Sequence, residues 1–192
     1  MKLTLPILLF SGLLGAAEPP IPRPAENIAI QVAPEKYLWL SEHSGQTCIL
    51  AFILTTCPHC QFTTGVLSHI AKDYAGKNVW IAASAVEPMS SLNIPDFVKK
   101  FMPEFPVGYN EQSYVAKFLG LPPNEPLFFP QVVFVDRGGI IRAQFTGGDK
   151  PMDKEIQEKT LRETLETTMK EGVKKEGVKK VASPGVHPTL PR

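Results

Sequence analysis

The sequence predicts an α/β fold in which a central mixed β-sheet carries helices on both faces. Strand-like and helix-like segments alternate along the chain, and the last two strand-like segments form a hairpin. Residues 49–54 are apolar without alternation, which is typical of a strand buried on both faces of a sheet. With 43% apolar residues among 192, the chain can build one packed domain of ordinary size.

The first strands are expected before residue 55. Residues 27–32 alternate weakly between apolar and polar side chains, which favours a strand. Runs 37–40 and 47–54 are both apolar, and the segment between them is short and contains Gly45. This pattern predicts a β-hairpin made of these two runs.

The middle of the chain shows helical and strand periods in turn. Apolar residues recur every four positions on one face of a helix that runs to Gly76, a residue suited to a helix C-terminus. These residues are Phe62, Val66, Ile70 and Tyr74. The following elements are predicted as a strand over 79–86, a helix over 94–101 with proline in its first turn, a short strand over 107–109 and a helix over 113–119.

The last third of the chain contains the clearest hairpin. Strands over 131–135 and 140–145 flank the glycine-containing turn 136–139. The preceding segment 121–130 holds four prolines and is expected to be a stiff loop. Residues 156–169 have the apolar stripe of an amphipathic helix, with Asp149 or Asp153 as its candidate cap.

Both ends of the chain differ in composition from the predicted domain at 37–169. Residues 1–17 combine a lysine, an apolar stretch and small residues, as a cleaved signal peptide does, although an uncleaved N-terminal segment is the alternative. Residues 18–36 are expected to be a Pro-rich linker and N-terminal extension. Residues 170–192 are expected to be a disordered basic and Pro-rich tail, with a surface-binding arm as the alternative.

The signal peptide predicts export, to the periplasm or to the outside of the cell. The apolar stretch is shorter than the ~20 residues a membrane span needs, so no stable membrane insertion is expected after cleavage. Export also places the chain where disulfides form and persist. The formal net charge is +1, which gives no reason to expect a nucleic-acid partner.

The most informative motif is Cys57-Pro58-His59-Cys60, which follows the buried strand and opens a helix. Unpaired N–H groups and a partial positive charge at a helix N-terminus stabilise a thiolate, so Cys57 is the expected nucleophile. Cys60 lies one helical turn further on and can close a disulfide with Cys57. Pro58 and His59 are expected to set how oxidising that disulfide is, because a protonated histidine favours the reduced pair.

Other uses of two close cysteines fit the sequence less well. A zinc site needs two further ligands, and the chain offers only a third cysteine and scattered histidines for them. A c-type haem needs histidine where Gln61 stands, and a purely structural disulfide gains little by closing so small a loop. We therefore expect redox chemistry with no metal and no organic cofactor. Cys48 is expected to be a small core residue, with a resolving or dimer-forming role as the alternative.

Together these features resemble the thioredoxin superfamily, and within it the exported TlpA- and ResA-like thiol–disulfide oxidoreductases. The resemblance covers roughly residues 37–169 and includes the redox motif, Phe129-Pro130 before a strand, and the turn 136–139. It implies a thioredoxin-like three-layer sandwich. It also implies disulfide exchange with protein thiols and disulfides, with Cys57 and Cys60 catalytic and a redox partner that resets the pair.

The resemblance further implies that Pro130 follows a cis peptide bond beside the redox pair. The backbone of Phe129 would then pair with an extended substrate segment placed over Cys57. Phe62, Leu127 and Phe128 are candidates for an apolar lip around the site.

Several positions depart from the family pattern. Thr56 stands where thioredoxins often carry tryptophan, and Ala51 stands where they carry a buried acid that relays protons. Glu87 and Lys72 are the candidate substitutes for that acid. The Pro-His dipeptide is the one found in DsbA-type oxidases, whereas the chain has no room for their helical insertion. The direction of the reaction therefore stays open.

Two other classes of function remain as alternatives. A peroxiredoxin-like peroxidase would share the sheet, but the close cysteine pair argues against it. A thioredoxin-fold metal-binding or chaperone module could hold a soft ion with two thiols and His59. Copper-delivery relatives place three residues between their cysteines, and that spacing is absent here.

Overall fold

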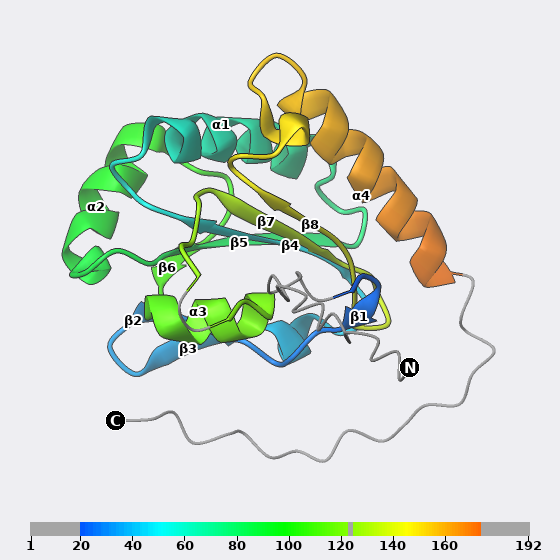
Figure 1. The fold of residues 1–192 in the computed structure, drawn as a ribbon, viewed down its shortest axis with the longest axis horizontal. Helices are drawn as coiled ribbons and strands as arrows, with labels where there is room; N and C mark the ends of the chain where they lie inside the picture. Colours follow the sequence, from blue (N-terminus) through cyan, green and yellow to red (C-terminus); the bar gives the residue numbers. More distant parts are fainter. Residues whose placement is uncertain (1–19, 123–124, 174–192) are drawn as a thin grey trace, which may run out of the picture.

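The computed structural model describes residues 20–122 and 125–173, and these form a mixed sheet with helices on both sides (Figure 1). The strands are β1 (Arg23–Pro24), β2 (Ala29–Ala33), β3 (Lys36–Trp39), β4 (Thr47–Ile53), β5 (Val79–Ala85), β6 (Val107–Tyr109), β7 (Gln131–Val135) and β8 (Ile140–Thr146). The α-helices are α1 (Pro58–Asp73), α2 (Ser90–Phe101), α3 (Gln112–Leu119) and α4 (Gln157–Val173), and short 3-10 helices span Leu40–His43 and Lys150–Met152.

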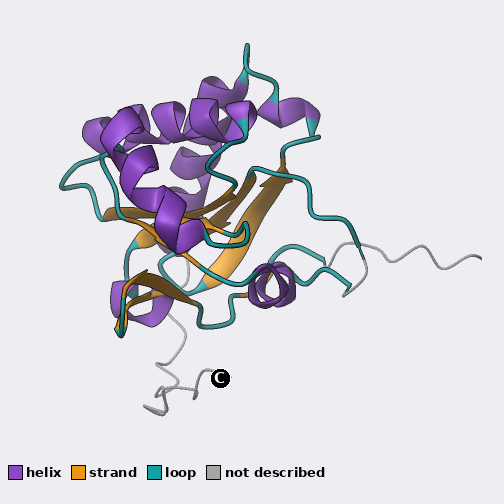
Figure 2. Ribbon diagram, turned by 90° about the vertical axis from the view of Figure 1, so that its left-hand side faces the viewer, coloured by secondary structure: helices purple, strands orange, loops and turns teal. Residues whose placement is uncertain are grey.

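The sheet has the strand order β1-β8-β7-β4-β5-β6-β2-β3. Strand β4 lies near its centre, parallel to β5 and antiparallel to β7, so the sheet is mixed. Helices α1, α2 and α4 cover one face and α3 covers the other (Figures 1 and 2). This three-layer arrangement confirms the predicted fold class.

The two hydrophobic cores follow from the side-chain alternation of β4. Every residue of β4 is buried. Ile49, Ala51 and Ile53 belong to the cluster under α1 and α4, whereas Leu50 and Phe52 belong to the cluster under α3. Because successive side chains of a strand point to opposite faces, an uninterrupted apolar run is what a strand with two covered faces requires.

The predicted hairpin at the end of the sheet is confirmed as β7 and β8. Asp136 fixes its turn, because its Oδ1 accepts hydrogen bonds from the Gly138 and Ile140 amides at 2.8 and 3.0 Å. Its Oδ2 lies 2.6 Å from the Arg142 guanidinium, and both side chains are largely buried.

The predicted hairpin of residues 37–40 with 47–54 is wrong. Strand β3 pairs with β2 instead, with Ile30 opposite Leu38, and forms the far edge of the sheet. The 3-10 helix at Leu40–His43 carries the chain from that edge to the centre. Strand β4 is apolar on both faces, so it is buried more fully between β5 and β7 than at an edge beside β3.

Helix α2 begins four residues before its predicted start at Ile94. The first turn forms upstream because the Ser90 amide donates to Glu87 O at 3.1 Å and the Leu92 amide donates to Met89 O at 2.9 Å. Pro95 therefore lies inside the helix. The carbonyl that loses its partner belongs to exposed Ser91, where water can satisfy it.

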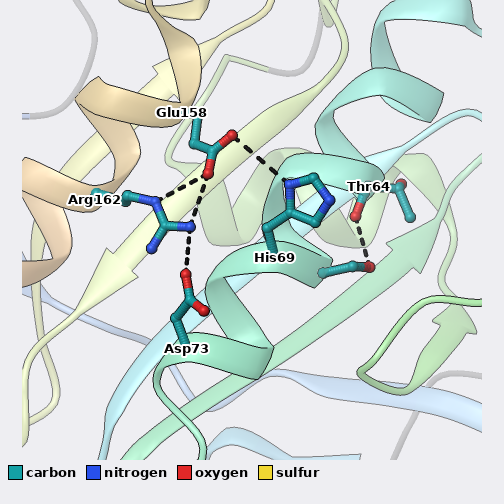
Figure 3. A network of polar contacts seen from close by, with 6 residues as sticks. Thr64, His69, Asp73, Glu158 and Arg162 are labelled. Carbon is teal, nitrogen blue, oxygen red and sulfur yellow. Dashed lines mark hydrogen bonds and ion pairs between the residues drawn. The ribbon is translucent and has the colours of Figure 1, made fainter.

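Helix α4 is fastened along α1 by a network of charged side chains (Figure 3). Arg162 lies between Asp73 and Glu158, at 2.7 and 2.8 Å from their carboxylate oxygens, and Glu158 also lies 3.8 Å from His69. Leu161 and Leu165 on the same helix are fully buried. The apolar stripe predicted for this helix thus packs on the sheet, and the polar residues beside it bind α1.

Part of the segment expected to be a Pro-rich extension joins the sheet. Strand β1 pairs with β8, and Ile28 and Ile30 are buried in the core under α3. The predicted signal peptide and residues 174–192 of the predicted tail lie outside the described residues. Among the helices of the described part, none has the length and apolar content that crossing a membrane requires.

Candidate active site

The redox motif lies where β4 ends and α1 begins. The Cys57 amide donates to Leu54 O at 3.2 Å, which closes a tight turn between the strand and the helix. Cys57 has extended backbone angles and occupies the N-cap of α1, and Pro58 takes the first helical position. Gln61 reaches back to Thr55 O at 2.9 Å and holds the turn from the first turn of the helix.

The two thiols have very different environments. Both are free; Cys57 is half-buried, and Cys60 is fully buried beneath it. The Cys60 amide points at Cys57 Sγ at 3.4 Å, and the Leu54 amide points at Cys60 Sγ at 3.5 Å. Cys57 is therefore accessible to a substrate sulfur from solvent, whereas Cys60 can react only with Cys57 or with a sulfur bonded to Cys57.

Burial raises the pKa of the Cys60 thiol well above its ordinary value, and the neighbouring Cys57 and Glu87 raise it further. The hydrogen bond from the Leu54 amide acts in the opposite direction. Cys60 is thus protonated at neutral pH. Cys57, by contrast, occupies the N-cap of α1, and its Sγ accepts the Cys60 amide N–H.

His59 is held by the segment that precedes α4. Its Nε2 lies 2.8 Å from Met152 O, and the Gln157 side-chain amide lies 3.3 Å from the same nitrogen. A carbonyl only accepts, so Nε2 carries a proton. The ring is therefore bound to Met152 while it stands two residues from Cys57, and its tuning of the thiolate stays a prediction.

The Phe129–Pro130 peptide bond is cis, as the family resemblance implied. Gln131, the next residue, lies opposite Phe52 in the antiparallel pairing of β7 with β4. Pro130 is therefore at the end of the sheet where β4 leads into Cys57. Phe129 and Cys57 also pack against the same core cluster. The structure brings both members of the predicted substrate-binding pair to the redox motif.

Glu87 is the acid that the structure brings to this site. The Thr55 amide donates to Glu87 Oε1 at 3.0 Å, and the Thr55 hydroxyl bonds to the same oxygen. Lys72, the other candidate, lies near the C-terminal end of α1, where its Nζ is 3.1 Å from Glu104. The parallel pairing of Ile53 with Ala85 explains the placement of Glu87, because residues two positions after each strand end meet at one edge.

The expected apolar lip is only partly as predicted. Phe128 is 62% exposed and Phe62 is 37% exposed, whereas Leu127 packs on the core under α3. Two exposed apolar side chains at the start of α2 were not predicted, namely Met89 and Leu92, at 72% and 71% exposed. They lie two and five residues after Glu87, so exposed apolar side chains follow closely on the acid that contacts Thr55.

Cys48 lies away from the redox motif, at the start of β4 and in the core under α3. Burial raises its pKa to about 12, so it is an inert core thiol at neutral pH. Within the described residues, no three histidine, cysteine, aspartate or glutamate side chains are grouped to hold a metal ion.

Several solved structures share this fold. A thioredoxin-family thiol:disulfide interchange protein from Chlorobium tepidum TLS superposes with a TM-score of 0.60 at 19% identity, over 75% of this chain and 97% of that one. The thioredoxin domain of a thiol-disulfide oxidoreductase from Bacteroides vulgatus gives 0.59 at 15% identity, over 79% and 99%. A thiol:disulfide interchange protein from Bacteroides sp. gives 0.59 at 14% identity, over 76% and 90%.

No protein-family model matches the chain, and no curated protein matches it. The structural similarity establishes that the chain has a thioredoxin-like fold, as the sequence motifs predicted.

Proposed function

We propose that this protein is an exported thiol–disulfide oxidoreductase that exchanges disulfides with other proteins through Cys57 and Cys60. The observation that carries the proposal is the asymmetry of the pair. Cys57 is accessible at a helix N-terminus, and Cys60 is fully buried with its amide aimed at Cys57 Sγ. A structural disulfide or a symmetric metal site has no need of one reachable and one concealed sulfur.

The exchange runs in two steps. In the reducing direction the Cys57 thiolate attacks a substrate disulfide, forms a mixed disulfide, and releases one substrate thiolate that takes up a proton. Cys60 then loses its proton and attacks Cys57 Sγ, so the Cys57–Cys60 bond forms and the second substrate thiolate leaves. The substrate disulfide gains two electrons and the enzyme dithiol loses them. The oxidising direction is the reverse.

The surface around Cys57 supports a polypeptide as the substrate. The backbone of Phe129, which precedes the cis bond to Pro130, is the proposed pairing edge for an extended substrate segment. Exposed Phe128, Met89 and Leu92 offer apolar contacts that an extended segment can cover. The solved structures with this fold include proteins described as thiol:disulfide interchange proteins, which is the activity proposed here.

Export supports the same activity. Residues 1–17 have the composition of a signal peptide, and an exported thiol pair works where disulfides are made and broken. A separate redox partner in that compartment resets Cys57 and Cys60 after each turnover. His59, two residues from Cys57, adjusts how readily the pair accepts electrons.

The test is insulin reduction with dithiothreitol as electron donor, followed by turbidity. The protein is expected to accelerate precipitation, and Cys57→Ser is expected to lose the acceleration. Cys48→Ala is the matched control because it removes a thiol outside the site, and it should retain the activity. Full activity in Cys57→Ser would exclude the proposal. A parallel Cu(I) titration that saturates at one ion per chain with no insulin reduction would favour a metal-binding module instead.

A further inference from the structure

Gln157 is a polar residue in an apolar part of the core. Helix α4 begins at this residue, which is fully buried and is followed on the same face by fully buried Leu161 and Leu165. Residues four apart share one face of a helix, so an apolar side chain would pack well at this position. Burying an amide there costs free energy unless its polar atoms are bonded. The partners of the Gln157 amide therefore indicate what the residue does.

The Gln157 side chain contacts His59 and two residues that also contact His59. Its Nε2 lies 3.3 Å from Met152 O and 3.3 Å from His59 Nε2, and its Oε1 lies 3.3 Å from the Thr63 hydroxyl. That hydroxyl donates to His59 O at 3.0 Å. Thr63 on α1, Met152 in the 3-10 helix and Gln157 on α4 are all fully buried. We call these three residues the His59 clamp.

The hydrogen bonds of the His59 clamp assign the donors. Met152 O only accepts, so both nitrogens beside it carry protons, namely His59 Nε2 at 2.8 Å and Gln157 Nε2. Two donors thus converge on one carbonyl, which has two lone pairs to receive them. The 3.3 Å between the two nitrogens is then a packing contact. Nδ1 is the nitrogen of His59 that remains to gain or lose a proton.

The clamp restricts a side chain that is half-buried and would otherwise rotate. A free imidazole samples several rotamers and exchanges its proton between two nitrogens, whereas a hydrogen bond at one nitrogen selects the tautomer. Gln157 gives Met152 O a second bond and fills the space beside His59 Nε2. A positive charge on a ring stabilises a nearby thiolate to an extent that depends on distance. A ring held in one place therefore acts on Cys57 with a constant strength.

We propose that Gln157 is a positioning residue for the redox pair. Together with the Met152 carbonyl it holds the His59 ring in one orientation and in the Nε2–H tautomer, and this fixed ring sets the reduction potential of the Cys57–Cys60 couple. The proposal rests on the thiol–disulfide exchange proposed above. Gln157 acts through His59 rather than on the sulfurs. The potential of the motif thus depends on the first residue of α4, which lies 98 positions further along the chain than His59.

The experiment measures the reduction potential of Gln157→Leu and of the wild type in glutathione buffers at pH 7. Leucine extends the apolar row of Leu161 and Leu165, so the variant is expected to fold. Without the amide the ring is released, and the potential should move towards reducing values, in the direction of His59→Ala. We expect the equilibrium constant with glutathione to change at least about threefold, which corresponds to about 14 mV.

A double-mutant cycle separates positioning from a general loss of packing. If Gln157 acts through His59, then Gln157→Leu should leave the potential unchanged in a His59→Ala background. Long-range proton–nitrogen NMR of the imidazole adds a spectroscopic signature. Neutral His59 should be the Nε2–H tautomer in the wild type and a mixture of both tautomers in Gln157→Leu. Thr168→Val is the matched control, because it removes another buried polar group from α4, and it should change neither measurement.

If Gln157→Leu fails to fold, Gln157→Asn decides instead. It keeps an amide but withdraws it from Met152 O by one methylene group, so it should shift the potential in the same direction. An unchanged potential in the variant that folds, or a shift of equal size in the His59→Ala background, overturns the assignment of Gln157. A neutral wild-type His59 with its proton on Nδ1 also overturns it. A wild-type Cys57–Cys60 pair that does not exchange with glutathione at all overturns the proposed function itself.

Discussion

Gly147→Ala should displace the Phe129–Pro130 segment, because Gly147 packs directly against it. A Cβ atom on Gly147 would lie 2.3 Å from Phe129 O, 2.6 Å from Phe129 C and 2.9 Å from Pro130 Cδ. Two of these atoms are backbone, so the clash cannot be relieved by a side-chain rotation. The segment that we propose to bind the substrate backbone must shift away from β8.

The size of the effect follows from overpacking. Inserting a methyl group into a well-packed contact costs about 1–3 kcal/mol. For a chain of this length each kcal/mol lowers the melting temperature by about 2–4 °C, so a fall of about 2–12 °C is expected. The neighbouring Gly148 has nothing within 4 Å of an added Cβ, so Gly148→Ala is the matched control and should melt within a degree or two of the wild type.

The activity assay adds a second readout. Gly147→Ala should lower kcat/KM for insulin, because the Phe129 backbone edge moves, while alkylation of Cys57 by iodoacetamide keeps its wild-type rate. If Gly147→Ala melts and turns over insulin as Gly148→Ala does, then the Phe129–Pro130 segment is not held by Gly147 or does not bind the substrate.

Other predictions concern stability and thiol reactivity. Asp136→Ala leaves the largely buried Arg142 without its closest carboxylate and should cost about 3 kcal/mol in urea unfolding; a loss under about 1 kcal/mol would contradict this. In the reduced native protein, iodoacetamide at pH 8 should label Cys57 well before the buried Cys48 and Cys60, as peptide mass spectrometry would show; equal labelling would exclude the asymmetric pair. Burial raises the pKa of both buried thiols above 9.0. The protonated thiols therefore make their full contribution to the free energy of unfolding below pH 9.0. Each buried thiol should lower the free energy of unfolding by about 1.4 kcal/mol per pH unit as pH rises towards 12, and Cys48→Ala should reduce that slope. A free energy of unfolding that does not change at alkaline pH would contradict this prediction.

Sequence patterns identified the elements better than they identified the partners of the strands. The apolar run of β4 and the hairpin of β7 and β8 carry local signals, namely an uninterrupted apolar stretch and a glycine turn. No local signal identifies the partner of β3. A short apolar run near Gly45 is equally compatible with a hairpin to β4 and with a position at the far edge of the sheet. Burial of both faces of β4 decides between them, and that is a property of the whole sheet.

The start of α2 was missed for a similar reason. Proline is favoured in the first turn of a helix, so Ile94–Pro95 predicts a helix N-terminus at this point. The actual first turn is set by hydrogen bonds from Ser90 and Leu92 to the loop after β5. A proline inside the helix is tolerated because the carbonyl it leaves free faces water.

In the candidate site, too, some features have a local sequence signal and others depend on contacts between distant parts of the chain. Cys57 and Cys60 follow from their spacing at the end of a buried strand, and the cis bond before Pro130 followed from the family resemblance. The contact of His59 with Met152 joins residues far apart in the chain and has no sequence signature. Glu87 was one of two candidates, and only the parallel register of β4 with β5 separates it from Lys72.

The reduction potential of the Cys57–Cys60 couple, measured by equilibration in glutathione buffers, tests the function most directly. A working exchange pair is expected between about −270 and −120 mV, with a value near the upper end indicating disulfide formation and one near the lower end indicating reduction. A value below about −300 mV, as structural disulfides have, or a pair that does not oxidise at all, would contradict the account.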